Sequence, residues 1–448
     1  MLRAISFKIY EMRRYLVLSL VISLVAIPFG NMIVIQRDRN RNEMYGEAFW
    51  IYGFGVYNMT DQELAESLPP EWGFNDGLHV LPSYLGNVKY EYPVFGLIFF
   101  AIATWLFPGV NDLQPLWLNF LLVLTFNLNL VLIAILLGDK IYYSRWARLF
   151  FAGYFVYGLI MSAGGGKLEP IADCLLLMTL VLRQEKQYGK AMFTLGLAVQ
   201  TKIYPAIFFP LIFIEAPLAA AWFFVSMLLT VVPLTVLGVN FQSLVNHFLN
   251  TSEYSSYIVN PLYPGLGIAS PNLTGGGVDS YFWPPGFVPL VVYVFTMLLT
   301  IQLYLPKRNE FAKASWKKRI ELLRPLYLYL LPGVLFLFRW VMPWYLFWLG
   351  PAVLLYDNDE QAIGYLKIIT VVGLLYCLGI ACNWPYFITG PLPDFTSHFV
   401  PGWYSLVGLT AIVLFTAIAY ALWKKAVERR DRQLQTIREA EERGELII

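Results

Sequence analysis

Residues 115–137 read PLWLNFLLVLTFNLNLVLIAILL, a stretch that contains no Asp, Glu, Lys or Arg. A helix of roughly 20 apolar residues is long enough to cross the hydrocarbon core of a bilayer. The stretch therefore predicts a transmembrane helix. Asn127 and Asn129 are the polar exceptions in its middle.

The composition extends this prediction to the whole chain. Of the 448 residues, 58% are hydrophobic and only 14% are charged, whereas a soluble domain carries roughly a quarter of charged residues. Aromatic residues reach 17%, which suits a protein with belts of aromatic side chains at the membrane interfaces. We therefore expect an all-α polytopic membrane protein.

Further apolar runs predict about 11–13 transmembrane helices in total. The first run is too long for a signal peptide and is expected to be a retained helix. Run 205–215 is short, and part of a broken or bent helix is the alternative to a full crossing there. Residues 93–108, bracketed by prolines, predict a helix that dips into the membrane or lies at its surface. The expected crossings lie near 15–35, 115–137, 147–162, 169–183, 190–203, 205–215, 217–238, 287–305, 325–340, 343–355, 366–384 and 402–422.

The positions of Lys and Arg orient these crossings. With both termini in the cytoplasm, all but seven of the 32 Lys and Arg residues lie on the cytoplasmic side, as the positive-inside rule requires. A full crossing at 93–108 would break this pattern. The predicted organisation is a transmembrane domain over 1–422, with exoplasmic loops near 36–114 and 239–286, followed by a charged cytoplasmic helical tail over 423–448.

Several classes of site are disfavoured by the scarce Cys and His residues. Cys174, Cys377 and Cys382 lie in or beside apolar runs, and the three His residues are scattered, so neither a disulfide framework nor a zinc site is expected. The chain has no phosphate-binding P-loop. We expect no cofactor and no nucleic-acid partner, with a divalent metal allowed but not indicated. The lack of disulfides and of a retention signal favours a prokaryotic plasma membrane, and the oligomeric state is left open.

Six of the seven basic residues on the exoplasmic side fall into two groups. Arg37, Arg39 and Arg41 follow the first helix in the run RDRNR and are expected to contact lipid headgroups. A cation at a helix end inside an apolar protein needs a partner. Three such cations predict a site for a lipid phosphate: Lys167 in GGGKLEP, Lys202 in QTKIYP and Arg339 in FRWVMPWY. Lys89 is the seventh.

Acidic residues in the first loop supply a second kind of chemistry. Glu47 lies among aromatic residues in NEMYGEAFWIYGFGVY, residues 42–57. Desolvation there would raise its pKa, and a general base that deprotonates a sugar hydroxyl needs such an environment. The acids of residues 60–71 are expected instead on the exposed face of a solvated helix.

These segments resemble the GT-C glycosyltransferases that use a polyprenyl-phosphate sugar, most closely family 87 and the mannosyltransferases of glycosylphosphatidylinositol (GPI) anchor synthesis. The resemblance covers most of the first 350 residues. It rests on YEYPVFG at 90–96, on GGGKLEPIADCLLL at 164–177, on GKAMFTLGLAVQTKIYPAIFFP at 189–210 and on RWVMPWYLFWLGP at 339–351.

The resemblance implies an inverting transferase that moves a monosaccharide, mannose above all, from a polyprenyl phosphate to a lipid or lipid-linked glycan on the exoplasmic face. Glu47 stands where the family has its catalytic acid. Family members usually have Asp there, so Glu43 and Asp76 are alternative bases. The implied sugar-binding or acceptor-binding residues are Tyr90, Tyr92, Glu169, Asp173 and Tyr204.

Two other readings of the chain stay open. One is a polymerase or ligase of lipid-linked glycans, although such enzymes use outward-facing Arg and His residues that are scarce here. The other is a transporter of lipid-linked sugars, which would favour polar residues inside the spans and internal repeats.

Overall fold

The computed structural model describes residues 2–30, 36–74, 89–109, 113–164, 166–244, 343–356 and 358–370, with isolated positions between 310 and 331 and at 432 and 435. The predicted crossings near 287–305 and 402–422 lie outside the described residues, as do Asp76, Arg339 and nearly all of the predicted tail.

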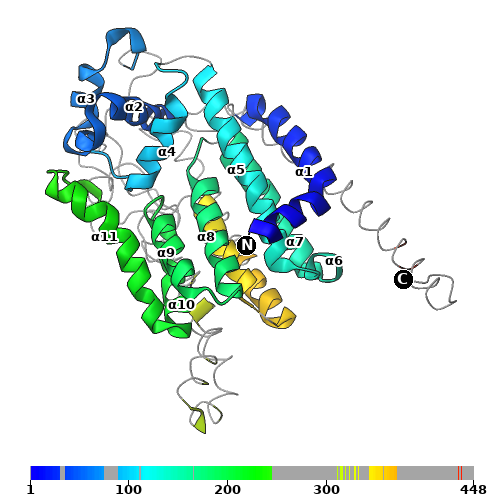
Figure 1. Cartoon of the computed structure of the whole chain (residues 1–448). Coiled ribbons are helices and arrows are strands. Elements are labelled where there is room, and N and C mark those ends of the chain that lie inside the picture. Colours follow the sequence, from blue (N-terminus) through cyan, green and yellow to red (C-terminus); the bar gives the residue numbers. More distant parts are fainter. Residues whose placement is uncertain are drawn as a thin grey trace, which may run out of the picture.

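Five helices pack side by side in a row, each against the next. Figure 1 shows them as the body of the molecule. In order of contact they are α1 (Leu2–Gly30), α5 (Leu113–Leu137), α8 (Glu169–Gln184), α9 (Tyr188–Val199) and α11 (Ala220–Val236). A helix satisfies its backbone N–H and C=O groups internally, which is the requirement that a bilayer imposes on a spanning segment.

Three of the described helices are long and apolar enough to cross a membrane. They are Pro115–Leu137, Arg145–Gly164 and Pro217–Val236. The second consists of α7 (Arg145–Leu159) and a π-helical turn, η4 (Ile160–Gly164). The described part of the chain contains helices and no strand, so the prediction of an all-α membrane protein is confirmed at this level.

Residues 204–219 form three short elements instead of one helix. They are the 3₁₀ turn η5 (Tyr204–Phe208), α10 (Phe209–Glu215) and the 3₁₀ turn η6 (Pro217–Ala219). Each has a proline in its first positions, where no N–H is needed, so the prolines divide the segment. The broken helix, the alternative to a full crossing here, is confirmed.

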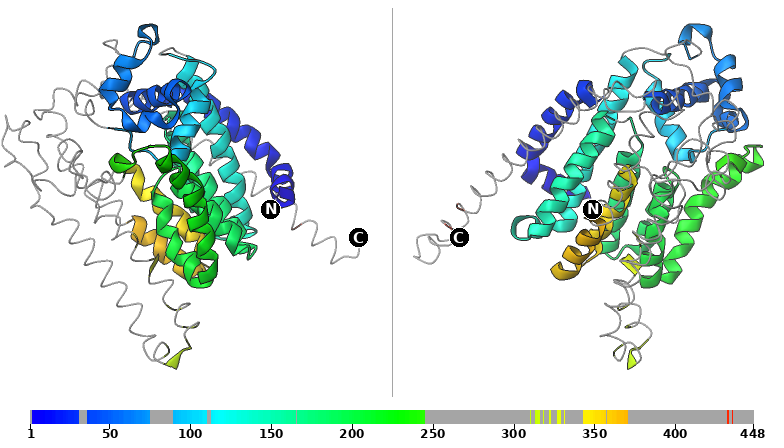
Figure 2. Two further views of the ribbon diagram at one scale, coloured as in Figure 1. Left: turned by 60° about the vertical axis from the view of Figure 1, so that its left-hand side comes forward. Right: turned by 180° about the vertical axis from the view of Figure 1, so that it is seen from behind.

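A compact cap, residues 36–74 and 89–109, covers one end of the row of helices (Figures 1 and 2). Its elements are α2 (Gln36–Tyr52), η1 (Gly53–Asn58), α3 (Asp61–Ser67), η2 (Pro70–Trp72) and α4 (Val94–Thr104). The backbones of α2 and α4 cross closely at Gly46, where a Cβ atom would lie 2.6 Å from the Phe100 carbonyl. Residues 93–108, expected to dip into the membrane or lie at its surface, thus contribute α4 to the cap.

The cap is fixed to the helix ends by backbone contacts. Phe95 N–H donates to the Gln200 carbonyl at the end of α9 (2.9 Å). Asn58 donates to the Gly238 carbonyl (3.1 Å) and accepts from Asn240 N–H (2.8 Å), just beyond α11. The start of α8 and the ends of α9 and α11 therefore meet the cap.

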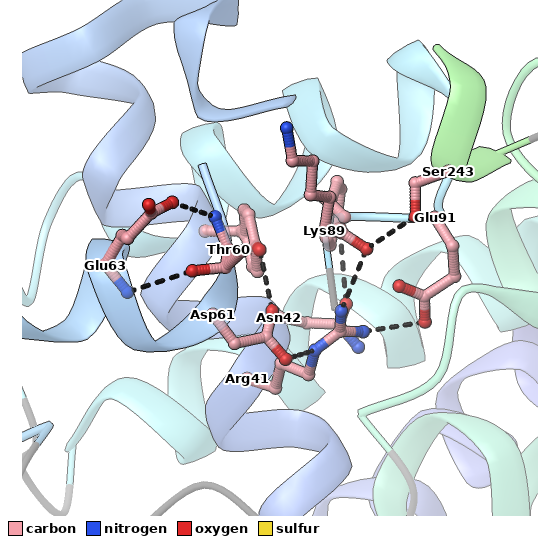
Figure 3. A network of polar contacts seen from close by, with 10 residues as sticks. Arg41, Asn42, Thr60, Asp61, Glu63, Lys89, Glu91 and Ser243 are labelled. Carbon is pink, nitrogen blue, oxygen red and sulfur yellow. Dashed lines mark hydrogen bonds and ion pairs between the residues drawn. The ribbon is translucent and has the colours of Figure 1, made fainter. Parts of the chain in front are cut away.

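Arg41 occupies the centre of a buried polar network inside the cap (Figure 3). Its guanidinium donates to Asp61 (2.7 Å) and Glu91 (2.6 Å), and Tyr45 donates its hydroxyl to Asp61 (2.6 Å). The expectation that Arg41 contacts lipid headgroups is wrong, because its side chain is 1% exposed and its charge is paired within the protein. Asp61, expected on a solvated face, is fully buried for the same reason.

The other end of the bundle carries the basic turns. The helix α6 (Lys140–Tyr143) lies there, away from the cap in Figures 1 and 2. At that end Arg183, in the last turn of α8, forms a two-pronged ion pair with Glu215, the last residue of α10 (2.8 and 2.5 Å). Lys186 lies in the adjoining connection to α9, and Lys190 lies in the first turn of α9.

Arg41→Ala is expected to lower the free energy of unfolding by about 3–5 kcal/mol, because it leaves two buried carboxylates without their cation. Arg13→Ala, at an exposed position on α1, is the matched control and should change stability by no more than about 0.5 kcal/mol. Thermal unfolding of the detergent-solubilised variants measures the difference. Equal stabilities would show that the Arg41 network does not hold the cap.

Candidate functional site

A buried ion pair joins the ends of α8 and α9 beneath the cap. Lys202 Nζ lies 2.5 Å from Glu169 Oε1, and the side chains are 13% and 0% exposed. α8 and α9 form an antiparallel hairpin, so the first residue of α8 meets the turn that follows α9. Lys202 Nζ also lies 5.2 Å from the centre of the Trp348 ring and 6.0 Å from that of Tyr92. Lys202 was predicted to bind a lipid phosphate, and in this structure it is paired with Glu169.

Asp173 lies one helical turn after Glu169 and is held by tyrosine hydroxyls. Tyr154 donates to it (2.9 Å), and so does Tyr204. Asn129 supports this arrangement, because its amide donates to the Tyr154 oxygen (3.1 Å) and to the Pro170 carbonyl (2.8 Å). Asn129, a polar residue in the middle of the apolar run at 115–137, therefore helps to position Asp173 on α8.

The loop before Lys167 packs closely against the cap. Gly166 has a left-handed backbone (φ +52°), and a Cβ atom there would lie 2.9 Å from the Arg39 side chain. Glycine alone suits both conditions. Lys167 is buried, and its backbone N–H donates to the Met161 carbonyl (3.3 Å). Arg39 in turn forms an ion pair with Glu43 (3.4 Å). The loop before Lys167 therefore lies next to α2 and close to Glu43, one of the candidate bases.

Both acid candidates on α2 that the structure describes are buried. Glu43 is 4% exposed and Glu47 is 2% exposed. Glu47 accepts a hydrogen bond from Gly109 N–H (2.7 Å), at the end of the segment that follows α4. Burial raises the pKa of Glu43, and the positive charge of Arg39 offsets part of the rise. The raised pKa expected of Glu47 stays a prediction.

The two predicted sugar-binding tyrosines of the first loop lie in different surroundings. Tyr90 is fully buried, stacks on Tyr45 (4.1 Å between ring centres) and donates its hydroxyl to Asn42 (3.2 Å). Tyr92 is half-buried and faces Lys202. Its carbonyl accepts from Tyr57 (2.8 Å). Tyr90 therefore serves the interior of the cap, whereas Tyr92 lies at the ion pair.

The structure thus assembles Lys202, Glu169, Asp173, Tyr92 and Tyr204 at the junction of the cap with α8 and α9. Among the residues that it describes, no group of three or more His, Cys, Asp or Glu side chains converges on a point where a metal ion would bind. Trp348 stacks on Tyr204 (4.6 Å between ring centres). It lies in the segment RWVMPWYLFWLGP, but nothing in the sequence marked it as a site residue. Tyr154 carried no signal in the sequence, since an aromatic residue in an apolar helix is ordinary.

Residues 161–259 match the family model described as Mannosyltransferase (PIG-M). This match confirms the predicted resemblance to the mannosyltransferases of GPI-anchor synthesis. The chain is a membrane glycosyltransferase. Comparison with curated proteins and with solved structures gives no match. The matched segment of the glycosyltransferase contains the ion pair, Asp173 and Tyr204, so the family resemblance and the buried polar cluster coincide.

Glu43→Gln tests the electrostatics of the α2 acids in this glycosyltransferase. The folded-state pKa of Glu43 lies above the ordinary value of 4.5, so the wild-type fold loses stability as pH rises through the interval between them. Glutamine imitates the protonated acid. The stability of Glu43→Gln relative to wild type should therefore grow as pH rises from about 4 to about 7.

Melting temperatures of both proteins across this interval measure the effect. Glu71→Gln, at an exposed position in the cap, is the control and should show a much flatter difference. A Glu43→Gln advantage that shrinks as pH rises would contradict the assignment.

Proposed function

We propose that the chain transfers mannose, with inversion at the anomeric carbon, from a polyprenyl-phosphate donor to a lipid or lipid-linked glycan on the exoplasmic face. The observation that carries the proposal is the buried polar cluster at the cap end of α8 and α9, inside the segment that matches the mannosyltransferase family. The cap covers this end of the bundle (Figure 1), and holding donor and acceptor there in a fixed orientation would favour the displacement.

The proposed orientation places the cap outside the cell and both termini in the cytoplasm. The end of the bundle away from the cap carries Arg183, Lys186 and Lys190, close to the α8–α9 connection. A basic turn at a membrane surface favours the cytoplasmic side. At the cap end, by contrast, Arg41 and Lys202 are paired with carboxylates.

In the proposed reaction an acceptor hydroxyl oxygen attacks the anomeric carbon of the donor while the bond from that carbon to the phosphate oxygen breaks. The acceptor proton passes to Glu47, or to its alternatives Glu43 and Asp76, and the polyprenyl phosphate leaves as an anion. Lys167, Lys202 and Arg339 are proposed to stabilise that anion. An ammonium group has three N–H donors, so Lys202 retains two after its contact with Glu169.

Glu47→Gln is expected to reduce transfer at least about a hundredfold, because a general base contributes about that much or more. The assay uses the full chain in lipid nanodiscs, with radiolabelled polyprenyl-phosphate mannose and a membrane-lipid extract as the acceptor mixture. Glu66→Gln, on the exposed side of α3, is the control and should retain activity.

Each other outcome of this assay has a definite meaning. Full activity of Glu47→Gln would move the base to Glu43 or Asp76 and keep the transferase. No transfer by the wild type from mannose, glucose or arabinose donors would overturn the proposal in favour of a polymerase, a ligase or a transporter.

The proposed reaction is metal-independent, because the leaving phosphate is stabilised by cationic side chains. Excess chelator in the same assay should leave the rate unchanged within about twofold, a change of under about 0.5 kcal/mol in the barrier. Loss of activity on chelation, restored by Mg²⁺ or Mn²⁺, would show that a metal ion shares this role.

A further inference from the structure

Within the part of the chain that the structure describes, three buried polar atoms near the ion pair have no hydrogen-bond partner: Glu169 Oε2, the Tyr157 hydroxyl and Trp348 Nε1. Leaving such a group unpaired costs about 1–3 kcal/mol, and native proteins contain few of them. Other such atoms occur elsewhere among the described residues, but these three belong to residues around the Lys202–Glu169 ion pair, where a bound ligand would complete their bonding.

Contacts between neighbouring side chains link the three residues to one region of the structure. The other oxygen of Glu169 holds Lys202, which lies 5.2 Å from the Trp348 ring. Phe347, the neighbour of Trp348, stacks on Tyr157 (4.8 Å between ring centres, 12° between planes). Lys202 keeps 13% of its side chain exposed, so this region borders the solvent-accessible side.

The chemistry of these atoms selects the class of ligand. A carboxylate oxygen only accepts, an indole N–H only donates, and a phenol hydroxyl does both. A phosphate oxygen would be repelled by the free carboxylate oxygen of Glu169. Sugar hydroxyls both donate and accept, and the stacked rings of Tyr204 and Trp348 supply the aromatic wall that small-molecule sites commonly have.

We propose that Glu169, Tyr157 and Trp348 form the subsite that binds the hydroxyl groups of the transferred sugar. This inference rests on the proposed function and deepens it, because it names the residues that distinguish one sugar from another. Glu169 then has two roles, one oxygen holding Lys202 and the other accepting from a sugar hydroxyl. The leaving phosphate binds on the Lys202 side of the same junction.

Tyr157→Phe tests this subsite without the risk of unfolding the protein. The substitution removes only a hydroxyl that has no partner in the protein, so the melting temperature should not fall. The ratio kcat/KM for transfer should fall about tenfold, the loss of one hydrogen bond to the substrate. Tyr154→Phe is the matched control: its hydroxyl holds Asp173, so that variant should lose stability.

Donors that each lack one mannose hydroxyl make the test specific. With the wild type, one of these deoxy donors should react about tenfold more slowly than mannose, and with Tyr157→Phe that same penalty should vanish. Unchanged activity of Tyr157→Phe, or penalties that persist undiminished in the variant, would overturn the subsite.

Sugar binding without turnover separates the two proposals. Methyl mannoside should raise the melting temperature of the wild type, and Tyr157→Phe should need about a tenfold higher concentration for the same rise. If the wild type is stabilised in this way but transfers nothing from any donor, the subsite stands and the proposed function fails. If the sugar stabilises neither protein, or both equally, the subsite is wrong.

Discussion

The ion pair between Lys202 and Glu169 is the interaction on which the arrangement of the site depends. A charge inside an apolar bundle is costly unless an opposite charge meets it at short range. The turn after α9 and the first residue of α8 therefore have to lie together, and the antiparallel hairpin of these helices allows it. The positions of Asp173, one turn along α8, and of Tyr204, two residues after Lys202, follow from this contact.

A buried charge that needs opposite charges at short range also organises the cap, where the charge is that of Arg41 on α2. Arg41 holds Asp61 and Glu91 against α2 through two ion pairs. Burial raises the pKa of Asp61, although Arg41 beside it works in the opposite direction. With α2 held in this way, Arg39 reaches the glycine turn before Lys167 and Glu43 is brought near the same turn. Glu43 on α2 and Lys167 just before α8 are therefore held close to the same turn.

The helices themselves could be predicted from the sequence because apolar length is a local property. Run 115–137 became α5, and run 205–215, too short for a full crossing, became part of a segment that prolines divide. The partners of the charges could not be predicted, since they are far apart in the chain. Arg41 is 50 residues from Glu91, and Lys202 is 33 residues from Glu169. Packing of the folded chain decides such pairs, so Arg41 was assigned to lipid headgroups and Lys202 to phosphate alone.

The most direct test of the central claim is a cryo-electron microscopy structure of the full chain in nanodiscs with a non-hydrolysable phosphonate analogue of polyprenyl-phosphate mannose. Sugar density is expected between the cap and the start of α8, against Glu169, Tyr157 and Trp348, with the phosphonate on the Lys202 side. Density at the opposite end, beside Arg183 and Glu215, would contradict the claim that mannosyl transfer takes place under the cap. A saturated sample with no density at either end would contradict it equally.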